Sequence, residues 1–219
     1  MEIPRIIHRV WLDDPMPARF AEHGERWAEL HPGWEVRDWM RTVDLPPLHN
    51  AQLFERARAY TSDWKRWQAD VLRLELLAQF GGVYVDVDCR PLRCLGPLLE
   101  GVRCFAGYSP NRGPGGRRLL TQAVLGSVPD HPFIRACISR MQGSVDRHRN
   151  QHIAQVTGPW HITRVYESDE WPDVTTFDEG VFYPVSIAAR DRGEEVDTGE
   201  AYVTHGWNTT ARKRGIGVA

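Results

Sequence analysis

Residues 81–88, which read Gly-Gly-Val-Tyr-Val-Asp-Val-Asp, constrain the fold more than any other part of the chain. The two glycines end a stretch of helical periodicity, and the β-branched and aromatic run that follows predicts a buried strand over 83–87. Side chains two residues apart on an extended chain point to the same face. Asp86 and Asp88 are therefore expected to converge at the C-terminal end of that strand.

Two carboxylates in one small volume repel each other unless a positive charge lies between them. A divalent cation is the natural partner, and oxygen ligands suit Mg²⁺ or Mn²⁺ better than Zn²⁺. An ion of this kind is often needed where a diphosphate binds and then leaves. We therefore interpret Asp86 and Asp88 as candidate metal ligands.

The stretch before the two glycines predicts a helix that Thr61 or Ser62 can cap and that continues to about residue 80. Asp70 and Arg73 lie one turn apart beside its apolar stripe, so this edge of the helix can face a cleft. Gly81 supplies the left-handed stop. The stripe follows spacings of three and four and consists of Trp64, Trp67, Val71, Leu74 and Ala78.

The rest of the chain alternates between strand-like and helix-like periods, which predicts an α/β fold with a mainly parallel central sheet flanked by helices. Ligands bind beyond the carboxyl ends of strands in such sheets, and the two aspartates lie at such an end. Residues 111–116 predict a glycine-rich loop, either a plain surface loop or a lid. Strands are expected over 3–11, 34–39, 103–108, 174–177, 181–183 and 201–204, and helices over 18–30, 119–125, 132–141 and 153–166.

The size and charge of the chain argue against several classes of protein. Its 219 residues suit one domain, which we place at 1–210, followed by a flexible basic tail at 211–219. A net charge of −2, with no extended basic surface, argues against nucleic-acid binding. No apolar run approaches the roughly 20 residues that span a membrane, and the N-terminus lacks the layout of a signal peptide. A cytoplasmic location is therefore expected.

The spacing of the cysteines and glycines argues against a zinc site and against two common nucleotide-binding motifs. Cys89, Cys94, Cys104 and Cys137 lack the paired spacing of a zinc site, and in a cytoplasmic chain they are expected to be reduced thiols. The sequence contains neither a phosphate-binding loop that ends in Gly-Lys-Ser/Thr nor a Gly-x-Gly-x-x-Gly fingerprint. A dinucleotide-dependent dehydrogenase is therefore disfavoured.

Several segments occur in an order typical of one enzyme family. Ile-Pro-Arg-Ile-Ile-His-Arg-Val-Trp opens the chain at 3–11, and Asp-Val-Leu-Arg-Leu-Glu-Leu-Leu at 70–77 precedes the aspartate segment. Pro-Asp-His-Pro-Phe at 129–133, Thr-Gly-Pro at 157–159 and Tyr-Val-Thr-His-Gly-Trp at 202–207 follow. This set resembles the glycosyltransferases with a DXD sugar-binding region. These include fungal α-1,6-mannosyltransferase-like and bacterial capsular polysaccharide enzymes, with the clostridial glucosylating toxins as more distant members.

The resemblance implies a GT-A fold, a UDP- or GDP-sugar donor, Mn²⁺ or Mg²⁺, and transfer to a glycan or other hydroxyl acceptor with retention. Asp88 would then bind the metal directly, and Asp86 would bond the ribose or reach the metal through water. Asp70 and Arg73 would hold the donor sugar and its phosphate. Gln122 lies about where related sequences often carry asparagine near the donor sugar.

The resemblance also implies roles for aromatic and polar residues outside the aspartate segment. Trp11 would lie against the base of the donor. His205 would complete the metal shell or contact the diphosphate, and Trp207 would close over it. Asn208 and Thr209 could add polar contacts. The Thr-Gly-Pro turn at 157–159 either lines the acceptor side or is purely structural.

Two other functions are compatible with parts of the pattern. A haloacid-dehalogenase-type phosphatase also places Asp-x-Asp after an apolar strand, but here Cys89 follows where threonine or valine is usual, and no convincing later acidic pair follows a strand. A non-catalytic carbohydrate-binding module would use tryptophans as sugar platforms and the aspartates for calcium.

Overall fold

The computed structural model describes residues 1–13, 15–40 and 45–207. Its strands form a six-stranded sheet in the order β2-β1-β3-β6-β5-β7 and a two-stranded sheet of β4 and β8. β6 is antiparallel to both of its neighbours, and the other pairs of the large sheet are parallel. The mainly parallel sheet is therefore confirmed. The strands are β1 (Ile6–Val10), β2 (Glu35–Trp39), β3 (Gly82–Val85), β4 (Cys89–Pro91), β5 (Cys104–Tyr108), β6 (Leu120–Ser127), β7 (Val174–Phe177) and β8 (Val203–His205).

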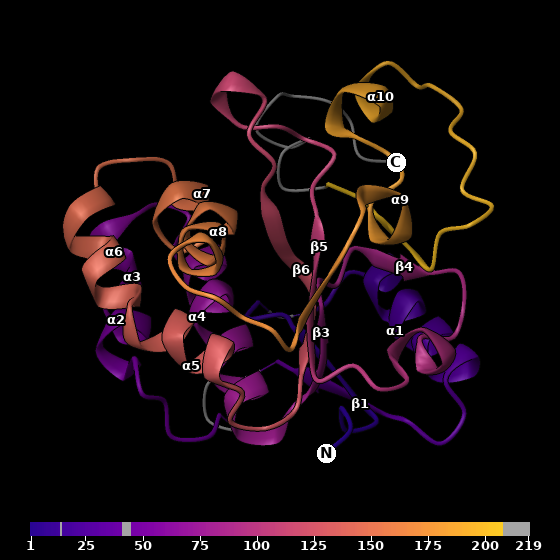
Figure 1. The fold of residues 1–219 in the computed structure, drawn as a ribbon, viewed down its shortest axis with the longest axis horizontal. Helices are drawn as coiled ribbons and strands as arrows, with labels where there is room; N and C mark the ends of the chain where they lie inside the picture. The colour runs from indigo at the N-terminus through magenta and orange to yellow at the C-terminus, as the bar shows by residue number, and fades with distance from the viewer. Residues whose placement is uncertain (14, 41–44, 208–219) are drawn as a thin grey trace.

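Helices cover both faces of the large sheet (Figure 1). α4, α5 and α8 lie on one side, and α1, α9 and the small sheet lie on the other. None of the described helices is long and apolar enough to cross a membrane. The helices are α1 (Ala18–Leu30), α2 (Ala51–Glu55), α3 (Ala57–Tyr60), α4 (Trp64–Phe80), α5 (Pro132–Ser139), α6 (Met141–His148), α7 (Ile153–Val156), α8 (Pro159–Glu167), α9 (Glu179–Phe182) and α10 (Ile187–Asp191), with 3₁₀ turns at Gly96–Leu99 and Pro114–Gly116.

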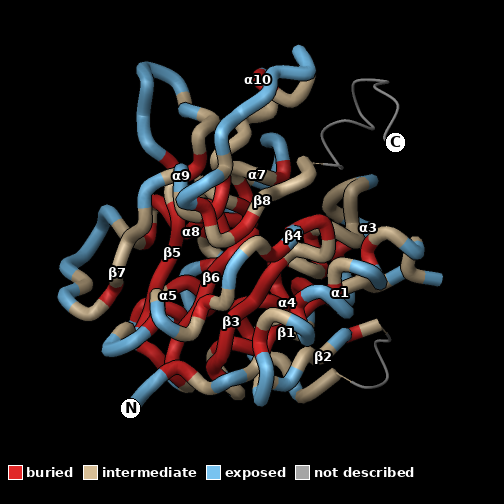
Figure 2. Tube along the Cα trace, turned by 90° about the vertical axis from the view of Figure 1, so that its right-hand side faces the viewer, coloured by how far each residue is buried: buried red, intermediate tan, exposed pale blue. Residues whose placement is uncertain are grey.

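The central strands are buried on both faces (Figure 2). On β3, Tyr84 belongs to the apolar cluster under α4, α5 and α8, whereas Val83 and Val85 belong to the cluster under α1 and α9. Successive side chains of a strand point to opposite faces, so one short strand supplies both cores. This double burial fixes the end of β3, and with it the position of the aspartates that follow.

The junction between α4 and β3 depends on its two glycines. Gly81 and Gly82 have φ values of +63° and +94°, a region that other residues rarely adopt. A Cβ on Gly82 would lie 2.6 Å from the carbonyl oxygen of Ile6 in the neighbouring strand. His8 is fully buried, and its Nε2 lies 2.9 Å from the carbonyl oxygen of Gly81. His8 therefore has a structural place in the sheet.

Three elements differ from those predicted by the sequence. Residues 119–125 form most of β6 rather than a helix, and all eight residues of that strand are buried. A strand covered on both faces shows no apolar alternation, so its sequence cannot be told from a buried helix by period. Residues 181–183 do not form a strand, because α9 ends at Phe182 and packs that ring against Phe105 and Phe177. The helix expected over 153–166 is divided at Thr157 and Gly158 into α7 and α8.

Candidate active site

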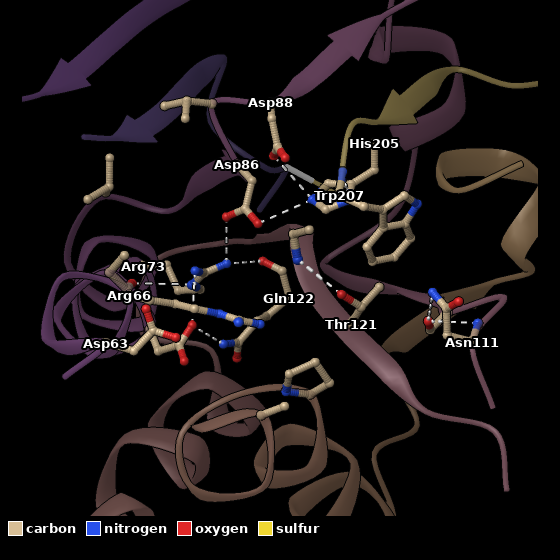
Figure 3. Close-up of a pocket in the computed structure, with 18 of the residues that line it drawn as sticks. Asp63, Arg66, Arg73, Asp86, Asp88, Asn111, Thr121, Gln122, His205 and Trp207 are labelled. Carbon is tan, nitrogen blue, oxygen red and sulfur yellow. Dashed lines mark hydrogen bonds and ion pairs between the residues drawn. The ribbon is translucent and has the colours of Figure 1, made fainter. Parts of the chain in front are cut away.

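Asp86 and Asp88 lie in a tight turn directly after β3, not on an extended strand that continues to residue 87. The amide of Asp86 donates to the carbonyl of Ala123 in β6 (2.8 Å), and the amide of Cys89 donates to the carbonyl of Asp86 (2.9 Å). Both carboxylates nevertheless point toward His205 (Figure 3). The predicted convergence is therefore observed, although the turn, and not an extended strand, produces it.

His205 lies between the two carboxylates. It is the last residue of β8, where it faces Cys89 of β4 in the antiparallel ladder. Its Nε2 is 3.4 Å from Oδ2 of Asp86 and 3.2 Å from Oδ1 of Asp88. Burial disfavours the charged imidazolium, but the carboxylates of Asp88 and Asp86 outweigh burial and raise the pKa of His205 to about 9. The backbone thus brings together the three side chains that the sequence suggested as metal ligands.

The composition of this cluster fits a hard divalent cation. Carboxylates are the ligands that Mn²⁺ and Mg²⁺ prefer, and an imidazole suits the transition metal Mn²⁺ better than Mg²⁺. Nε2 of His205 makes no directed hydrogen bond within the described chain. The Sγ atom of Cys89 also lies within 4.8 Å of ligand atoms of Asp88 and His205. Burial raises the pKa of the Cys89 thiol well above its ordinary value, so the sulfur stays protonated at neutral pH. The anionic atoms of the cluster at neutral pH are therefore carboxylate oxygens.

Arg73 of α4 holds the other side of Asp86. Its Nη1 donates to Oδ1 of Asp86 (2.9 Å) and to the carbonyl of Gln122 (2.8 Å), and Nη2 forms an ion pair with Asp70 (3.0 Å). The hydroxyl of Tyr84 donates to the same Oδ1 (2.8 Å). Burial opposes ionisation of Asp86, but Arg73 outweighs it and lowers the pKa of that carboxyl. Asp86 is thus an ionised, oriented carboxylate whose Oδ2 faces His205.

Asp70 lies on the same helix, and both oxygens of its carboxylate accept hydrogen bonds from other side chains of the protein. Oδ1 accepts from Nε2 of Gln122 (2.6 Å), and Oδ2 accepts from the hydroxyl of Thr157 (2.8 Å). Burial raises the pKa of Asp70, and the charges of Arg73 and Arg66 oppose that rise. The side chains of Asp70 and Arg73 are each only 4 % exposed, so this is a buried network and not an ordinary surface pair on a helix.

These residues line one cavity of about 650 Å³, a volume in the range of sites for nucleotide-sized ligands. Trp11 lines it directly after β1, with its ring 5.5 Å from that of Phe20. Trp207 lines it beside His205, with 4.1 Å between the two ring centroids, and its Nε1 donates to the carbonyl of Val185 (2.8 Å). All of the described residues that the sequence assigned to the donor or the metal therefore border one cavity, and their roles stay predictions.

Sequence reasoning missed three supports of the site. Tyr84 could have been found, because it lies two residues before Asp86 on the same strand and shares its face. Gln122 was expected near the donor sugar, but its bond to Asp70 was not expected, and nothing suggested that Thr157 would bond the same carboxylate. Gln122 and Thr157 lie 52 and 87 residues after Asp70, so no local pattern could reveal these contacts.

The glycine-rich loop borders the same cavity. Its 3₁₀ turn at Pro114–Gly116 is exposed, and Gly113 and Pro114 line the cavity. A Cβ on Gly113 would lie 2.8 Å from the ring of Trp160, so the loop packs closely against α8. The turn at 157–159 has a clear structural part through Thr157, and its Pro159 also lines the cavity. Asn208, Thr209 and the basic tail at 211–219 lie outside the described residues.

Comparison with known proteins gives a consistent result. The family model described as "Glycosyltransferase sugar-binding region containing DXD motif" matches residues 17–104. Lactosylceramide 4-alpha-galactosyltransferase of Pongo pygmaeus is 30 % identical over 163 residues, which cover 65 % of this chain and 68 % of that protein. Mannosyl phosphorylinositol ceramide synthase CSH1 of Saccharomyces cerevisiae is 27 % identical over 174 residues, which cover 75 % of this chain.

The chain spans less than half the length of the fungal relatives it matches, with 43 % of the CSH1 synthase covered. Among solved structures, the UDP-bound glycosyltransferase domain of the YGT toxin superposes with a TM-score of 0.57 at 12 % identity. That superposition covers 80 % of this chain and 79 % of the toxin domain. The likeness concerns the fold alone, and it confirms the GT-A type of α/β architecture.

Proposed function

Because the chain belongs to the glycosyltransferases that contain a DXD sugar-binding region, we propose that it transfers a sugar from a nucleotide diphosphate sugar to an acceptor hydroxyl, with a divalent metal and with retention at the anomeric carbon. The observation that carries this proposal is the position of His205 Nε2, within 3.4 Å of oxygens of both Asp86 and Asp88 at the edge of a nucleotide-sized cavity.

Asp86, Asp88 and His205 would hold the metal, with Asp88 as the direct carboxylate ligand. When bound, Mn²⁺ or Mg²⁺ supplies a Lewis acid for the charge that develops on a departing diphosphate. The high pKa of His205 supports this assignment, because the space between the carboxylates favours a positive charge. Metal binding would then release the proton of His205, since a ligating imidazole must be neutral.

The buried pair on α4 positions the donor. Arg73 presents a fixed positive charge beside Asp86, where it would favour the phosphate oxygens of the donor. Asp70 is held in one orientation by Arg73, Gln122 and Thr157, and it would accept hydrogen bonds from sugar hydroxyls. Trp11 would lie against the nucleobase, and Trp207 would cover the diphosphate beside His205.

The acceptor hydroxyl would attack the anomeric carbon from the face that the diphosphate leaves, which keeps the configuration. The departing phosphate oxygen would take the proton of that hydroxyl, so we assign no side chain as a general base or a covalent nucleophile. The names of the fungal and primate relatives refer to mannosyl and galactosyl transfer and to ceramide-linked molecules. They support a hexose donor and a lipid-linked glycan as one class of acceptor.

The experiment measures thermal stabilisation by UDP or GDP with and without Mn²⁺, together with hydrolysis of UDP- and GDP-hexoses. We expect stabilisation that requires both the nucleotide and the metal. Asp88→Ala should stay folded and lose metal-dependent stabilisation and turnover. The control Asp169→Asn removes an exposed carboxylate that pairs with Arg140 outside the cavity, and it should match the wild type.

The same measurements with an aryl phosphate and with free glycans separate the alternatives. Release of phosphate from an aryl phosphate, without any nucleotide binding, would favour the phosphatase. Stabilisation by free glycans alone would favour the carbohydrate-binding module. Transfer by Asp88→Ala at the wild-type rate would contradict the metal site proposed here.

A further inference from the structure

The backbone of Trp207 lies in a conformation that tryptophan rarely adopts. Its φ is +52°, and Asp130 is the only other residue besides glycine with a positive φ in the described part of the chain. For a bulky side chain this left-handed region is an outlier, because Cβ crowds the following carbonyl oxygen. Such a conformation persists only where surrounding groups hold it, and it is found most often at ligand-binding sites. Specific contacts are therefore expected to hold Trp207.

Arg190 of α10 supplies these contacts. Its Nη1 donates to the carbonyl oxygen of Trp207 (2.7 Å) and to that of Gly206 (3.0 Å). Successive carbonyls of an extended chain point to opposite sides, so one donor cannot reach both. They point the same way where the second residue has helical dihedral angles of either hand. The pair of bonds from Arg190 therefore favours the left-handed conformation of Trp207 over an extended one.

The guanidinium of Arg190 is itself held in place. Its Nε donates to Oδ1 of Asp191 (3.0 Å), and the side chain of Arg190 is only 22 % exposed. α10 is anchored at its start, where the amide of Ile187 donates to Oδ1 of Asn111 (3.2 Å) and the side chain of Ser186 caps the helix. Arg190 thus extends from a fixed element to the chain that follows β8.

The conformation of Trp207 determines where its ring lies. The ring lies beside His205 at the large cavity (Figure 3), with 4.1 Å between the two centroids, and its Nε1 donates to the carbonyl of Val185 (2.8 Å). Because φ sets the direction of the Cα–Cβ bond relative to the preceding chain, a change to an ordinary negative φ would turn the ring out of this position. Arg190 does not line the cavity, so it can act on a ligand there only through other residues.

The residues that we assign to the metal are held independently of Arg190. The ladder between β4 and β8 places His205 opposite Cys89, and the amide of Gly206 donates to the carbonyl of Asp88 (3.0 Å). Neither contact involves the side chain of Arg190. Removal of that side chain is therefore expected to release Trp207, while Asp88 and His205 keep their places.

We propose that Arg190 is a positioning residue for the transfer reaction, because its two bonds to main-chain carbonyls fix the ring of Trp207 over the diphosphate of the donor. This inference rests on the proposed function, in which Trp207 covers that diphosphate. A covered diphosphate leaves the cavity more slowly, so Arg190 would govern how long the donor and the nucleoside diphosphate product stay bound. It would do so without contact with either molecule.

The test compares the full chain with Arg190→Met, Trp207→Leu and the double variant. Methionine is also long and unbranched, but it lacks the donors of arginine. Calorimetry measures the affinity for Mn²⁺ alone and then for UDP and GDP in saturating Mn²⁺. Stopped-flow fluorescence measures how fast the bound nucleotide dissociates. The control Arg192→Met removes an equal charge from an exposed side chain that pairs with Glu194, and it should match the wild type in every assay.

We expect Arg190→Met to bind Mn²⁺ as the wild type does and to bind the nucleotide about tenfold more weakly, mainly because dissociation is faster. Trp207→Leu should show a similar loss. In the Trp207→Leu background, Arg190→Met should weaken binding by less than about twofold more, because an effect that passes through Trp207 cannot be lost twice. Arg190→Lys lacks the planar set of donors and should lose part of the affinity, and it takes the place of Arg190→Met in this cycle if that variant does not fold.

The outcomes separate this inference from the proposed function. Wild-type nucleotide affinity in Arg190→Met would overturn the inference, and so would a loss that adds in full to that of Trp207→Leu. An equal loss of Mn²⁺ affinity would also overturn it, because Arg190 would then support the metal ligands instead of Trp207. All three results leave the proposed function standing. If the wild-type chain shows no metal-dependent binding of UDP or GDP, the proposed function itself fails.

Discussion

Thr157→Val tests whether the donors around Asp70 stabilise the fold as well as the site. The hydroxyl of Thr157 donates to Oδ2 of Asp70 at 2.8 Å, and Thr157 is fully buried. Valine has nearly the same shape, so the substitution removes a hydrogen bond without opening a cavity. A hydrogen bond to a charged group contributes about 1.5–3 kcal/mol, and we expect the free energy of unfolding to fall by about 2 kcal/mol.

The expected change in melting temperature follows from the size of the chain. An unfolding entropy of about 2.1 cal/mol/K per residue gives about 0.46 kcal/mol/K for 219 residues. A loss of about 2 kcal/mol therefore lowers the melting temperature by about 4 °C. Urea denaturation followed by tryptophan fluorescence measures the free energy, and calorimetry measures the temperature.

The control is a double-mutant cycle with Asp70→Asn, which removes the charge and keeps the shape of residue 70. If the bond is charge-assisted, Thr157→Val should lower the free energy of unfolding clearly less in the Asp70→Asn background than in the wild type. The coupling energy between the two substitutions should exceed about 0.5 kcal/mol. A Thr157→Val variant as stable as the wild type, or a coupling energy near zero, would refute the reasoning.

Two further predictions concern stability away from the cavity. Burial lowers the pKa of His8 and of His161 to about 4, so between about pH 6.5 and 4 the unfolded chain takes up protons that the folded chain cannot. The free energy of unfolding should fall by about 2 kcal/mol per histidine between pH 7.5 and 5. The urea midpoint should fall less over this range in His161→Phe than in the wild type. An equal fall in both proteins would contradict the role given to His161. Gly24→Ala should destabilise the chain by about 1–3 kcal/mol in thermal denaturation, because its Cβ would overlap Nη1 of the fully buried Arg9. The control Gly143→Ala meets only the exposed side chain of Arg147, at 3.3 Å, and should be neutral or stabilising; equal effects of the two variants would exclude the steric explanation.

The parts of the fold with a clear period were predictable from the sequence. The helix expected to end near residue 80 is α4, and its left-handed stop at Gly81 is present, although the helix begins at Trp64 without a side-chain cap. The strand β6 was not predictable in the same way, because every one of its residues is buried and its apolar run has no period. The periodic spacing of α4 thus identified a helix, whereas the apolar run of β6 could not be assigned to a strand or a helix by period.

The same distinction between local and long-range information applies to the candidate site. Asp86 and Asp88 are neighbours in sequence, so their convergence follows from local geometry alone. The bonds of Gln122 and Thr157 to Asp70 join segments that are far apart in the chain. Only the order of the strands and the break between α7 and α8 bring those donors to one carboxylate, and neither can be read from residue spacing.

The ladder between β4 and β8 has a consequence for how this site can change during evolution. Main-chain hydrogen bonds hold residue 205 opposite Cys89, and such bonds do not depend on which side chain occupies the position. Asparagine, aspartate or glutamate could therefore replace the imidazole there without moving the backbone. If the site holds a metal as proposed, the preference for one ion over another could then change by single substitutions at residue 205, while the rest of the fold is kept.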